Sequence, residues 1–184
     1  MRIISGSKKG KKLLLPNPKI TRPLKDNVKE NIFNILLHTR EFKVNLENQS
    51  VIDFFAGSGS FGIECLSRGA KFVTFIESNN ETRNTLFRNL NNNFDKLKFE
   101  IKKDSYFNID ILSLIQNYKP SIVFFDPPYE INEKEKIYQF IKNANIKDLL
   151  LILHVEEKTN IDFSNYKNLM VRKYGISKVF FLKN

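Results

Sequence analysis

Short apolar runs alternate with amphipathic segments along most of the chain after residue 50. The apolar runs have the length and the β-branched and aromatic content of buried strands, whereas the amphipathic segments repeat apolar residues at helical spacing. The predicted strands are 51–55, 72–76, 97–101, 121–125 and 149–155. The predicted helices are 60–68, 80–94, 108–118 and 133–144. This alternation indicates a parallel sheet with helices on both faces and right-handed crossovers.

The C-terminal part of the chain departs from this alternation. Two further apolar runs, 169–174 and 177–182, are separated only by Gly175 and Ile176. Because so short a link cannot make a crossover, these two strands must pair antiparallel. We therefore predict an α/β, Rossmann-like fold with a seven-stranded, mostly parallel sheet and an antiparallel last strand.

The N-terminal part of the chain is predicted to form a small β extension. It contains two short apolar runs around glycine-bearing turns, a pattern that indicates a hairpin-like structure. A helix is expected at 27–38, where Asn27 and Glu30 fit a capping box. We therefore divide the chain into a basic extension at 1–20 and a main domain at 21–184.

The composition limits the classes of protein to consider. With 184 residues, of which 41% are apolar, the chain can form one globular domain with a small appendage. No apolar segment approaches the roughly 18 residues of a membrane span, and no export signal opens the chain. Cys65 is the only cysteine, so an intramolecular disulfide is impossible and a reducing cytoplasm is expected. We expect a cytoplasmic monomer.

Most of the positive charge is concentrated at the N-terminus. Residues 1–29 contain nine basic residues and one acid, Asp26, and so carry eight of the ten net positive charges. A basic segment of this kind favours a phosphate-rich partner, since each phosphate contact releases condensed counterions. A solvated lysine surface is the alternative interpretation. The predicted RNA contacts are Lys8, Lys9, Lys11, Lys12 and Arg22.

A glycine-rich segment at residues 57–62 joins the first strand of the sheet to its helix. Its G-x-G-x-x-G pattern is weak evidence alone, because the pattern also fits NAD or FAD. The pyrophosphate of a dinucleotide would meet the helix N-terminus, and Asp53, just ahead of the glycines, would tend to repel it. The same carboxylate suits a cofactor that carries an ammonium group and a sulfonium, and S-adenosylmethionine carries both.

Two further acids follow the next two strands of the predicted sheet. Glu77 ends the strand 72–76, where a carboxylate can accept hydrogen bonds from both ribose hydroxyls, although a solvated surface acid fits equally well. Asp104 follows the third strand and is expected to accept the adenine amino group; its alternative role is the N-cap of the next helix. The predicted cofactor-binding residues are Asp53, Phe55, Ala56, Gly57, Ser58, Gly59, Glu77, Ser78, Asp104 and Ser105.

The tetrapeptide Asp126-Pro127-Pro128-Tyr129 directly follows the strand 121–125. In open α/β sheets, ligands bind in the crevice outside the carboxyl ends of the strands. Hydrogen-bond acceptors and a flat aromatic face can hold a planar heterocycle with an exocyclic amine at this place. Two prolines after a strand can also form a rigid turn without any ligand. We predict that these four residues form the catalytic group.

Together these motifs resemble the class I S-adenosylmethionine-dependent methyltransferases that act on amino groups. Outside them, Arg2–Gly6, Thr21–Pro23 and Phe33–Leu36 resemble the N-terminal signature of the 16S ribosomal RNA guanine-N2 methyltransferase D family. The resemblance covers nearly the whole chain. It implies S-adenosylmethionine as cofactor and methyl transfer to the exocyclic N2 amine of a guanine, in 16S ribosomal RNA or in the assembling small ribosomal subunit. No metal is expected, because transfer itself neutralises the sulfonium.

Some positions depart from the family pattern. Asn27 and Lys29 replace arginines near the start of the first helix, which puts a phosphate contact there in doubt. The segment between residues 155 and 169 is short for a full helix. His154 lies near the end of the strand 149–155, where a substrate contact is conceivable, but a structural or surface role is favoured for it and for His38.

Other functions fit parts of the pattern. An adenine-N6 DNA methyltransferase or a protein-glutamine methyltransferase would use the same chemistry, but such enzymes more often carry Asn in place of Asp126. The basic extension also argues against a protein substrate. A non-catalytic RNA-binding module would keep the fold without binding S-adenosylmethionine. A nicotinamide-dependent oxidoreductase is disfavoured by Asp53 and by the tetrapeptide.

Overall fold

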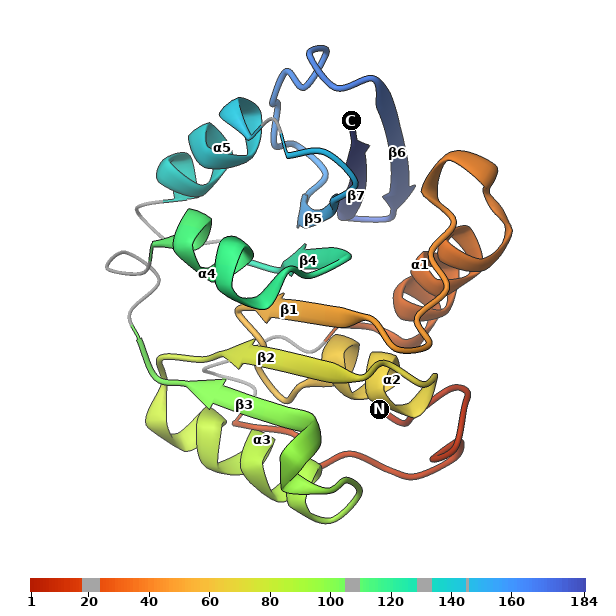
Figure 1. The fold of residues 1–184 in the computed structure, drawn as a ribbon, viewed down its shortest axis with the longest axis vertical. Helices are drawn as coiled ribbons and strands as arrows, with labels where there is room; N and C mark the ends of the chain where they lie inside the picture. Colours follow the sequence, from red (N-terminus) through yellow and green to blue (C-terminus); the bar gives the residue numbers. More distant parts are fainter. Residues whose placement is uncertain (18–23, 105–109, 129–133, 145) are drawn as a thin grey trace.

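A seven-stranded mixed sheet lies at the centre of the molecule (Figure 1). The structure is a computed structural model that describes residues 1–17, 24–104, 110–128, 134–144 and 146–184. The strand order is β3-β2-β1-β4-β5-β7-β6, and β7 runs antiparallel to both of its neighbours. The strands are β1 (Ser50–Phe54), β2 (Phe72–Ile76), β3 (Phe99–Lys102), β4 (Ile122–Phe125), β5 (Leu150–Glu156), β6 (Asn168–Tyr174) and β7 (Ser177–Lys183). The predicted sheet is therefore confirmed.

Helices cover both faces of this sheet. The described helices are α1 (Asp26–His38), α2 (Ser60–Ser67), α3 (Asn80–Asn91), α4 (Ile111–Tyr118) and α5 (Lys134–Asn143), with 3-10 turns at Arg40–Phe42 and Lys96–Lys98. One apolar cluster joins α1, α2 and α3 to the sheet, and a second joins α4 and α5 to it. The segment between β5 and β6 contains no helix, as its length suggested.

The central strands are apolar on both faces because both faces are covered. Alternate residues of β4 enter opposite clusters: Phe124 packs with the α1–α3 cluster, and Phe125 with the α4–α5 cluster. Phe61 of α2 stacks on Phe124 with ring centroids 4.2 Å apart, and Phe33 of α1 stacks on Phe61 at 5.3 Å. Burial of each such ring contributes roughly 1.5–3 kcal/mol to stability, so this column fixes α1 and α2 against the sheet.

The first helix begins one residue earlier than predicted, and the expected capping box is wrong. Its N-cap is Lys25, which makes no side-chain cap hydrogen bond. Asn27 lies within the first turn, where its Oδ1 accepts from the N–H of Val28 (2.9 Å). Tertiary contacts anchor this helix end instead: the buried Lys29 ammonium lies 3.6 Å from the Asp26 carboxylate and donates to the Arg2 carbonyl (2.7 Å).

In the N-terminal extension, Arg2 and Lys12 form an isolated antiparallel bridge and not two full strands. Backbone hydrogen bonds flank this bridge: the Ile3 N–H donates to the Lys11 carbonyl (2.9 Å), and the Leu13 N–H donates to the Met1 carbonyl (3.3 Å). The extension also packs closely against the helices. Ile3 and Leu13 are buried in the same cluster as α1 and α2. Gly6 has a φ of +80°, and a Cβ at this position would meet the Ser67 carbonyl oxygen at 1.9 Å. The extension is therefore held both by its own backbone hydrogen bonds and by packing against the end of α2.

Candidate active site

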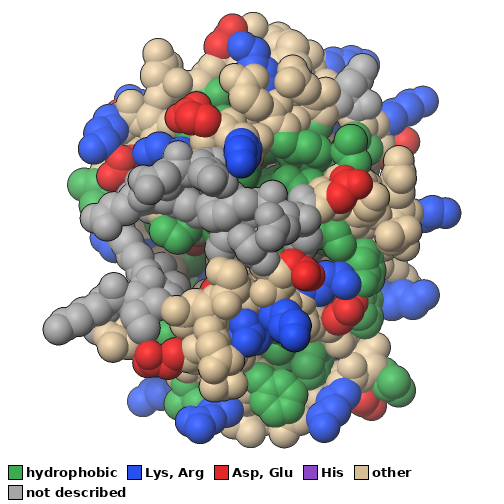
Figure 2. All heavy atoms as spheres, turned by 90° about the vertical axis from the view of Figure 1, so that its left-hand side faces the viewer, with side chains coloured by type: hydrophobic (Ala, Val, Ile, Leu, Met, Phe, Trp, Pro, Cys, Tyr) green, Lys and Arg blue, Asp and Glu red, His purple; other side chains and the backbone are tan. Residues whose placement is uncertain are grey.

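The candidate site lies at the carboxyl ends of β1, β2 and β4, which are neighbours in the sheet. The carboxyl ends of β1 and β2 point to the left in Figure 1. Figure 2 looks onto this edge and shows Lys and Arg side chains on several sides of it rather than in one cluster. Ligands of open α/β sheets bind at such an edge.

The loop between β1 and α2 is folded back tightly on itself. Phe55, Gly57 and Gly59 all have left-handed backbones, with φ of 65°, 58° and 83°. The Gly59 N–H donates to the Ala56 carbonyl (2.8 Å), and the Ala56 N–H donates to the carbonyl of Ile76 at the end of β2 (3.0 Å). A left-handed conformation is uncommon at a non-glycine residue such as Phe55, and such conformations cluster at functional sites.

The third glycine of the motif allows α2 to approach the sheet closely. A Cβ at Gly62 would lie 2.4 Å from Phe75 Cε1 and 2.9 Å from Val73 Cγ1, both on β2. Only a residue without a side chain fits there unless these core side chains shift. The G-x-G-x-x-G spacing therefore has the structural context that the motif requires, a strand, a tight turn and a packed helix.

Asp53 is hydrogen-bonded to the start of α2, directly after this loop. Its side chain is 1% exposed, and its Oδ2 accepts a hydrogen bond from the Gly62 N–H (2.9 Å). Burial raises the pKa of Asp53 well above its ordinary value; the Gly62 hydrogen bond opposes this shift, and the neighbouring Asp126 and Glu77 carboxylates add to it. The three acids therefore lie close enough to interact, and they make this edge of the sheet electronegative.

Glu77 is hydrogen-bonded to the loop itself. Its Oε2 accepts from the Gly57 N–H (2.9 Å), and its Oε1 accepts from the Asn79 N–H (2.8 Å). Glu77 is buried, so the alternative of a solvated surface acid is wrong. Both carboxylate oxygens of Glu77 therefore hold backbone N–H groups at the edge of the sheet.

Asp126 lies beside the glycine loop. Its N–H donates to the carbonyl of Phe54, the last residue of β1 (3.3 Å), and thereby extends the β1–β4 ladder to the edge of the sheet. Its Oδ1 lies 2.8 Å from Nδ1 of His154 on β5. The Asp-led turn and the glycine loop, 64–69 residues apart in sequence, therefore meet at one edge of the sheet.

The chain is similar in sequence to a known protein family over nearly its whole length. The family model described as conserved hypothetical protein 95 matches residues 1–183. The ribosomal RNA small subunit methyltransferase D of Haemophilus influenzae is 34% identical over 183 residues, which cover 96% of this chain and 90% of that protein. The chain belongs to this methyltransferase D family.

Solved structures place the family in the expected fold class. The crystal structure of HI0767 from Haemophilus influenzae has a TM-score of 0.74 and 29% identity, and it covers 100% of this chain and 98% of its own. An RNA methyltransferase from Salinibacter ruber, solved with S-adenosyl-L-homocysteine, has a TM-score of 0.60 at 12% identity, covering 88% of this chain and 92% of its own. At that identity the likeness concerns the fold alone. The class I methyltransferase fold predicted from the motifs is confirmed.

The other predicted site residues of this methyltransferase differ in burial and in position along the sheet edge. Pro127 is buried and Pro128 exposed, both directly after Asp126. Ser78 and Asp104 are exposed at the carboxyl ends of β2 and β3. The alternative role of Asp104 as the N-cap of α4 is wrong, because Asp110 caps that helix by accepting from the Ser113 N–H (3.1 Å). The predicted residues Arg22, Ser105 and Tyr129 lie outside the described residues.

The predicted RNA-binding lysines of the extension lie beside α2 and α3. The Lys8 N–H donates to Oγ of Ser67, the last residue of α2 (3.0 Å). Because α2 starts at the glycine loop and has eight residues, its far end is about 12 Å from the loop. Lys9, Lys11 and Lys12 are exposed. Lys8 therefore lies at the far end of α2, whereas Lys12 is two residues from Leu14, which Asn89 of α3 links to Ser58 of the glycine loop.

The structural role favoured for His154 agrees with its burial and with its contact with Asp126. Two further buried polar residues near the site were missed by reasoning from the sequence: Asn89 donates to the Ser58 carbonyl (3.0 Å), and Lys29 donates to Ser60 Oγ (3.2 Å). Lys29 is completely buried, and this burial lowers its pKa, so a contact with RNA phosphate is excluded for it in this fold. Polar residues on otherwise amphipathic helices gave no signal that distinguishes them from surface residues.

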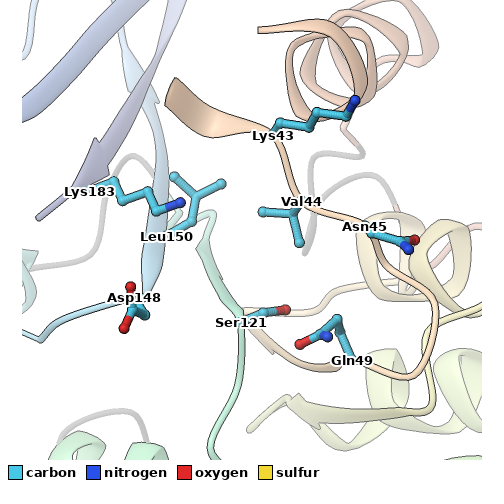
Figure 3. A pocket seen from close by; sticks show the side chains of 8 residues that line it. All are labelled: Lys43, Val44, Asn45, Gln49, Ser121, Asp148, Leu150 and Lys183. Atoms are coloured by element: carbon cyan, nitrogen blue, oxygen red, sulfur yellow. The ribbon is translucent and has the colours of Figure 1, made fainter. Parts of the chain in front are cut away.

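A separate pocket of about 240 Å³ lies at the opposite edge of the sheet (Figure 3). It opens beside the starts of β4 and β5, where ligands of this fold class do not bind. Its lining residues are Lys43, Val44, Asn45, Gln49, Ser121, Asp148, Leu150 and Lys183.

In the described part of the chain, no helix has the length and apolar composition that crossing a membrane requires. In the same residues, no cluster of three or more His, Cys, Asp or Glu side chains is arranged to hold a metal ion.

Proposed function

We propose that this methyltransferase transfers a methyl group from S-adenosylmethionine to the exocyclic N2 amine of a guanine in 16S ribosomal RNA. The relative from Haemophilus influenzae carries the name of a small-subunit ribosomal RNA methyltransferase. The single observation that carries the catalytic part of the proposal is the 3.3 Å hydrogen bond from the Asp126 N–H to the Phe54 carbonyl. It brings the amine-binding turn and the cofactor loop to adjacent strand ends.

The residues at the sheet edge fit S-adenosylmethionine. This cofactor supplies an electrophilic methyl group on a positively charged sulfur. Asp53, Glu77 and Asp126 interact with one another electrostatically, and a cluster of carboxylates favours a ligand with positive charges over a pyrophosphate. The left-handed Gly57 and Gly59 give the loop its tight shape, and a Cβ at Gly59 would meet Leu86 and Ile63 of the core at 2.5 and 2.9 Å. A dinucleotide would place its phosphates against the same acids.

Within this proposal, each acid of the site has a separate role. Asp53 shapes the loop and contributes negative charge beneath it. Glu77, held at the end of β2 by its bonds to Gly57 and Asn79, accepts hydrogen bonds from the two ribose hydroxyls. Asp104, exposed at the end of the neighbouring strand, accepts the adenine amino group together with Ser105.

Asp126 prepares the substrate amine for transfer. The lone pair of an aryl amine is delocalised into its ring, so the nitrogen is a poor nucleophile. Hydrogen bonds from its N–H groups to the Asp126 carboxylate and the Pro127 carbonyl favour a pyramidal nitrogen. These acceptors also match the positive charge that develops on nitrogen during transfer. Tyr129 stacks on the guanine, which must leave its neighbours in the RNA to reach the site.

The basic extension holds RNA at a distance from the target base. Its four lysines lie beside α2 and α3, with Lys8 about one α2 length from the glycine loop, and they contact phosphates of nucleotides that neighbour the target. The RNA partner is 16S ribosomal RNA or the assembling small subunit, and the enzyme works as a cytoplasmic monomer. Arg22 is proposed as a further RNA contact.

The test is a methylation assay with S-adenosylmethionine labelled in its methyl group. Purified small subunits, naked 16S RNA and DNA serve as parallel substrates, and mass spectrometry of digested product identifies the modified base. We expect N2-methylguanine in RNA from the wild-type protein and from Glu30→Ala, which changes an exposed acid of α1. Asp126→Ala is expected to lose methyl transfer while calorimetry still detects cofactor binding. N6-methyladenine in DNA as the only product would show that the substrate assignment is wrong.

A further inference from the structure

His154 and Asp126 occupy equivalent positions on adjacent strands. The β4–β5 ladder pairs Phe125 with Leu153, and the next residues along each strand are Asp126 and His154. Their side chains lie on the same face of the sheet, with Asp126 Oδ1 2.8 Å from His154 Nδ1. The His154 side chain is only 10% exposed, and that of Asp126 is 20% exposed. The contact therefore follows from strand register and not from a chance meeting of surface side chains.

The surroundings of the second imidazole nitrogen, Nε2, indicate which protonation state of His154 the structure favours. Among the described residues, no group forms a hydrogen bond with His154 Nε2, which is buried. An imidazolium would leave a charged N–H donor buried without an acceptor, which is the costliest arrangement. A neutral ring protonated on Nε2 would set the Nδ1 lone pair against the Asp126 carboxylate. The neutral ring protonated on Nδ1 avoids both costs and donates its proton to Asp126 Oδ1.

We propose that His154 is a positioning residue for Asp126: its Nδ1–H holds Oδ1 and leaves Oδ2 as the acceptor for the substrate amine. This inference rests on the proposed function, because it assigns the orientation of the group that holds the amine. A carboxylate on a short side chain can otherwise rotate about its Cβ–Cγ bond. With Oδ1 fixed, the remaining oxygen keeps one direction, and the amine meets a preformed acceptor.

The proton balance of the reaction agrees with this assignment. As the new carbon–nitrogen bond forms, the carbon–sulfur bond breaks and its electron pair stays on sulfur. The amine nitrogen then releases one of its protons to Oδ2 of Asp126 or to water. His154 keeps its single Nδ1 proton throughout, so it takes no part in the transfer and acts only through Asp126.

The tautomer of His154 can be measured without any enzymatic reaction. Nitrogen-15 NMR of protein labelled at histidine distinguishes a ring protonated on Nδ1 from one protonated on Nε2. We expect the Nδ1–H form for His154 in the wild-type protein and its loss in Asp126→Ala. An Nε2–H ring or an imidazolium in the wild-type protein would overturn the inference. His38, exposed at the end of α1, provides the reference signal of a solvated histidine.

Two substitutions separate positioning from packing. His154→Phe keeps the ring volume and removes the donor, whereas His154→Asn offers a side-chain N–H at nearly the same place as Nδ1. We expect roughly 10- to 100-fold lower kcat for His154→Phe, with KM and cofactor affinity little changed, because misplaced catalytic groups cost rates of this size. His154→Asn should recover most of that kcat. The same changes at His38 should leave kcat unchanged.

The outcomes distinguish this inference from the proposed function. If His154→Phe retains wild-type kcat, or if His154→Asn is as slow as His154→Phe at equal melting temperature, the positioning role is wrong even though the enzyme methylates RNA. If the wild-type protein methylates no nucleic acid, the proposed function fails, and the NMR measurement still decides whether His154 orients Asp126.

Discussion

Asn89 on α3 holds Leu14 of the N-terminal extension by two hydrogen bonds, in the way that an adjacent strand would. Its Oδ1 accepts from the Leu14 N–H (2.8 Å), and its Nδ2 donates to the Leu14 carbonyl (3.0 Å). The same Nδ2 also donates to the carbonyl of Ser58 in the glycine loop (3.0 Å). One buried amide therefore ties the basic extension to the cofactor loop.

Asn89→Ala is expected to destabilise both the extension and the loop. Three hydrogen bonds are lost, and the backbone groups left without partners are largely shielded from water, so we expect the free energy of unfolding to fall by about 2–3 kcal/mol. S-adenosylmethionine should also bind more weakly, because the loop must be reordered on binding. Chemical denaturation and calorimetry measure the two effects. Asn84→Ala, an exposed position on the same helix, should change neither quantity.

Glu77 links the same loop to β2, and its charge can be tested separately from its size. Glu77→Gln keeps one acceptor oxygen but turns an NH₂ group toward either the Gly57 or the Asn79 N–H. Since hydrogen bonds to a charged acceptor are worth about 1.5–3 kcal/mol, we expect cofactor affinity to fall roughly 10- to 100-fold. Isothermal calorimetry provides the measurement. Glu81→Gln, exposed in the first turn of α3, is the control, and an equal loss there would contradict a specific role for Glu77.

The strands of the sheet and the antiparallel pairing of the last two could be predicted because their signals are local. β4 is a continuous apolar run since both faces of the sheet are covered, and the two-residue link at Gly175 leaves only an antiparallel pairing. The helix start at Asp26 could not be predicted in the same way. Asn27 and Glu30 match a capping box, but the contacts of Lys29 with Arg2 and Asp26 decide where the helix begins.

The candidate site was predicted where its motifs are contiguous in sequence and missed where it depends on distant partners. The glycine loop and Asp126 follow apolar strands, so their place at the sheet edge can be read from the sequence. His154 meets Asp126 across 28 residues, and Asn89 meets Ser58 across 31. A lone polar residue on a strand or helix does not reveal its partner until register and packing are known.

Asp53 should make stability depend on pH in a direction opposite to that of a salt-bridged acid. Its pKa is raised in the folded state, mainly by burial, so the folded protein retains a proton that the unfolded chain releases near pH 3.9. The contribution of this group is therefore fully present below the unfolded pKa and is lost as pH rises through the folded pKa. Stability of the wild-type protein relative to Asp53→Asn should fall across this window.

The matching measurement compares the free energy of unfolding with pH in the two proteins without cofactor. Asn at position 53 can still accept from the Gly62 N–H but carries no charge, so above the window Asp53→Asn should be the more stable protein. Its affinity for the cationic cofactor should be lower than that of the wild type. Glu30→Gln, at an exposed position, should leave the pH dependence unchanged. Parallel pH curves for wild type and Asp53→Asn would contradict the assigned pKa shift.

The lysines of the extension should control how RNA binding depends on salt. Replacement of Lys8, Lys9, Lys11 and Lys12 by Ala removes four positive charges from the extension. Each lost contact with a phosphate should reduce the slope of log K against log salt by about 0.7–0.9, so the slope should become distinctly shallower. Because the lysines lie away from Asp126, kcat at saturating RNA should change little while KM rises.

A charge-matched variant separates contacts of the extension from the effect of net charge. Lys43, Lys142, Lys147 and Lys167 are exposed and belong to the opposite half of the sheet, around β4, β5 and α5. Their joint replacement by Ala lowers the net charge by the same amount but should alter the salt slope less. Filter binding or fluorescence anisotropy across a salt series measures both variants. Equal slopes for the two variants would mean that RNA responds to total charge, and the extension would then have no special role in positioning it.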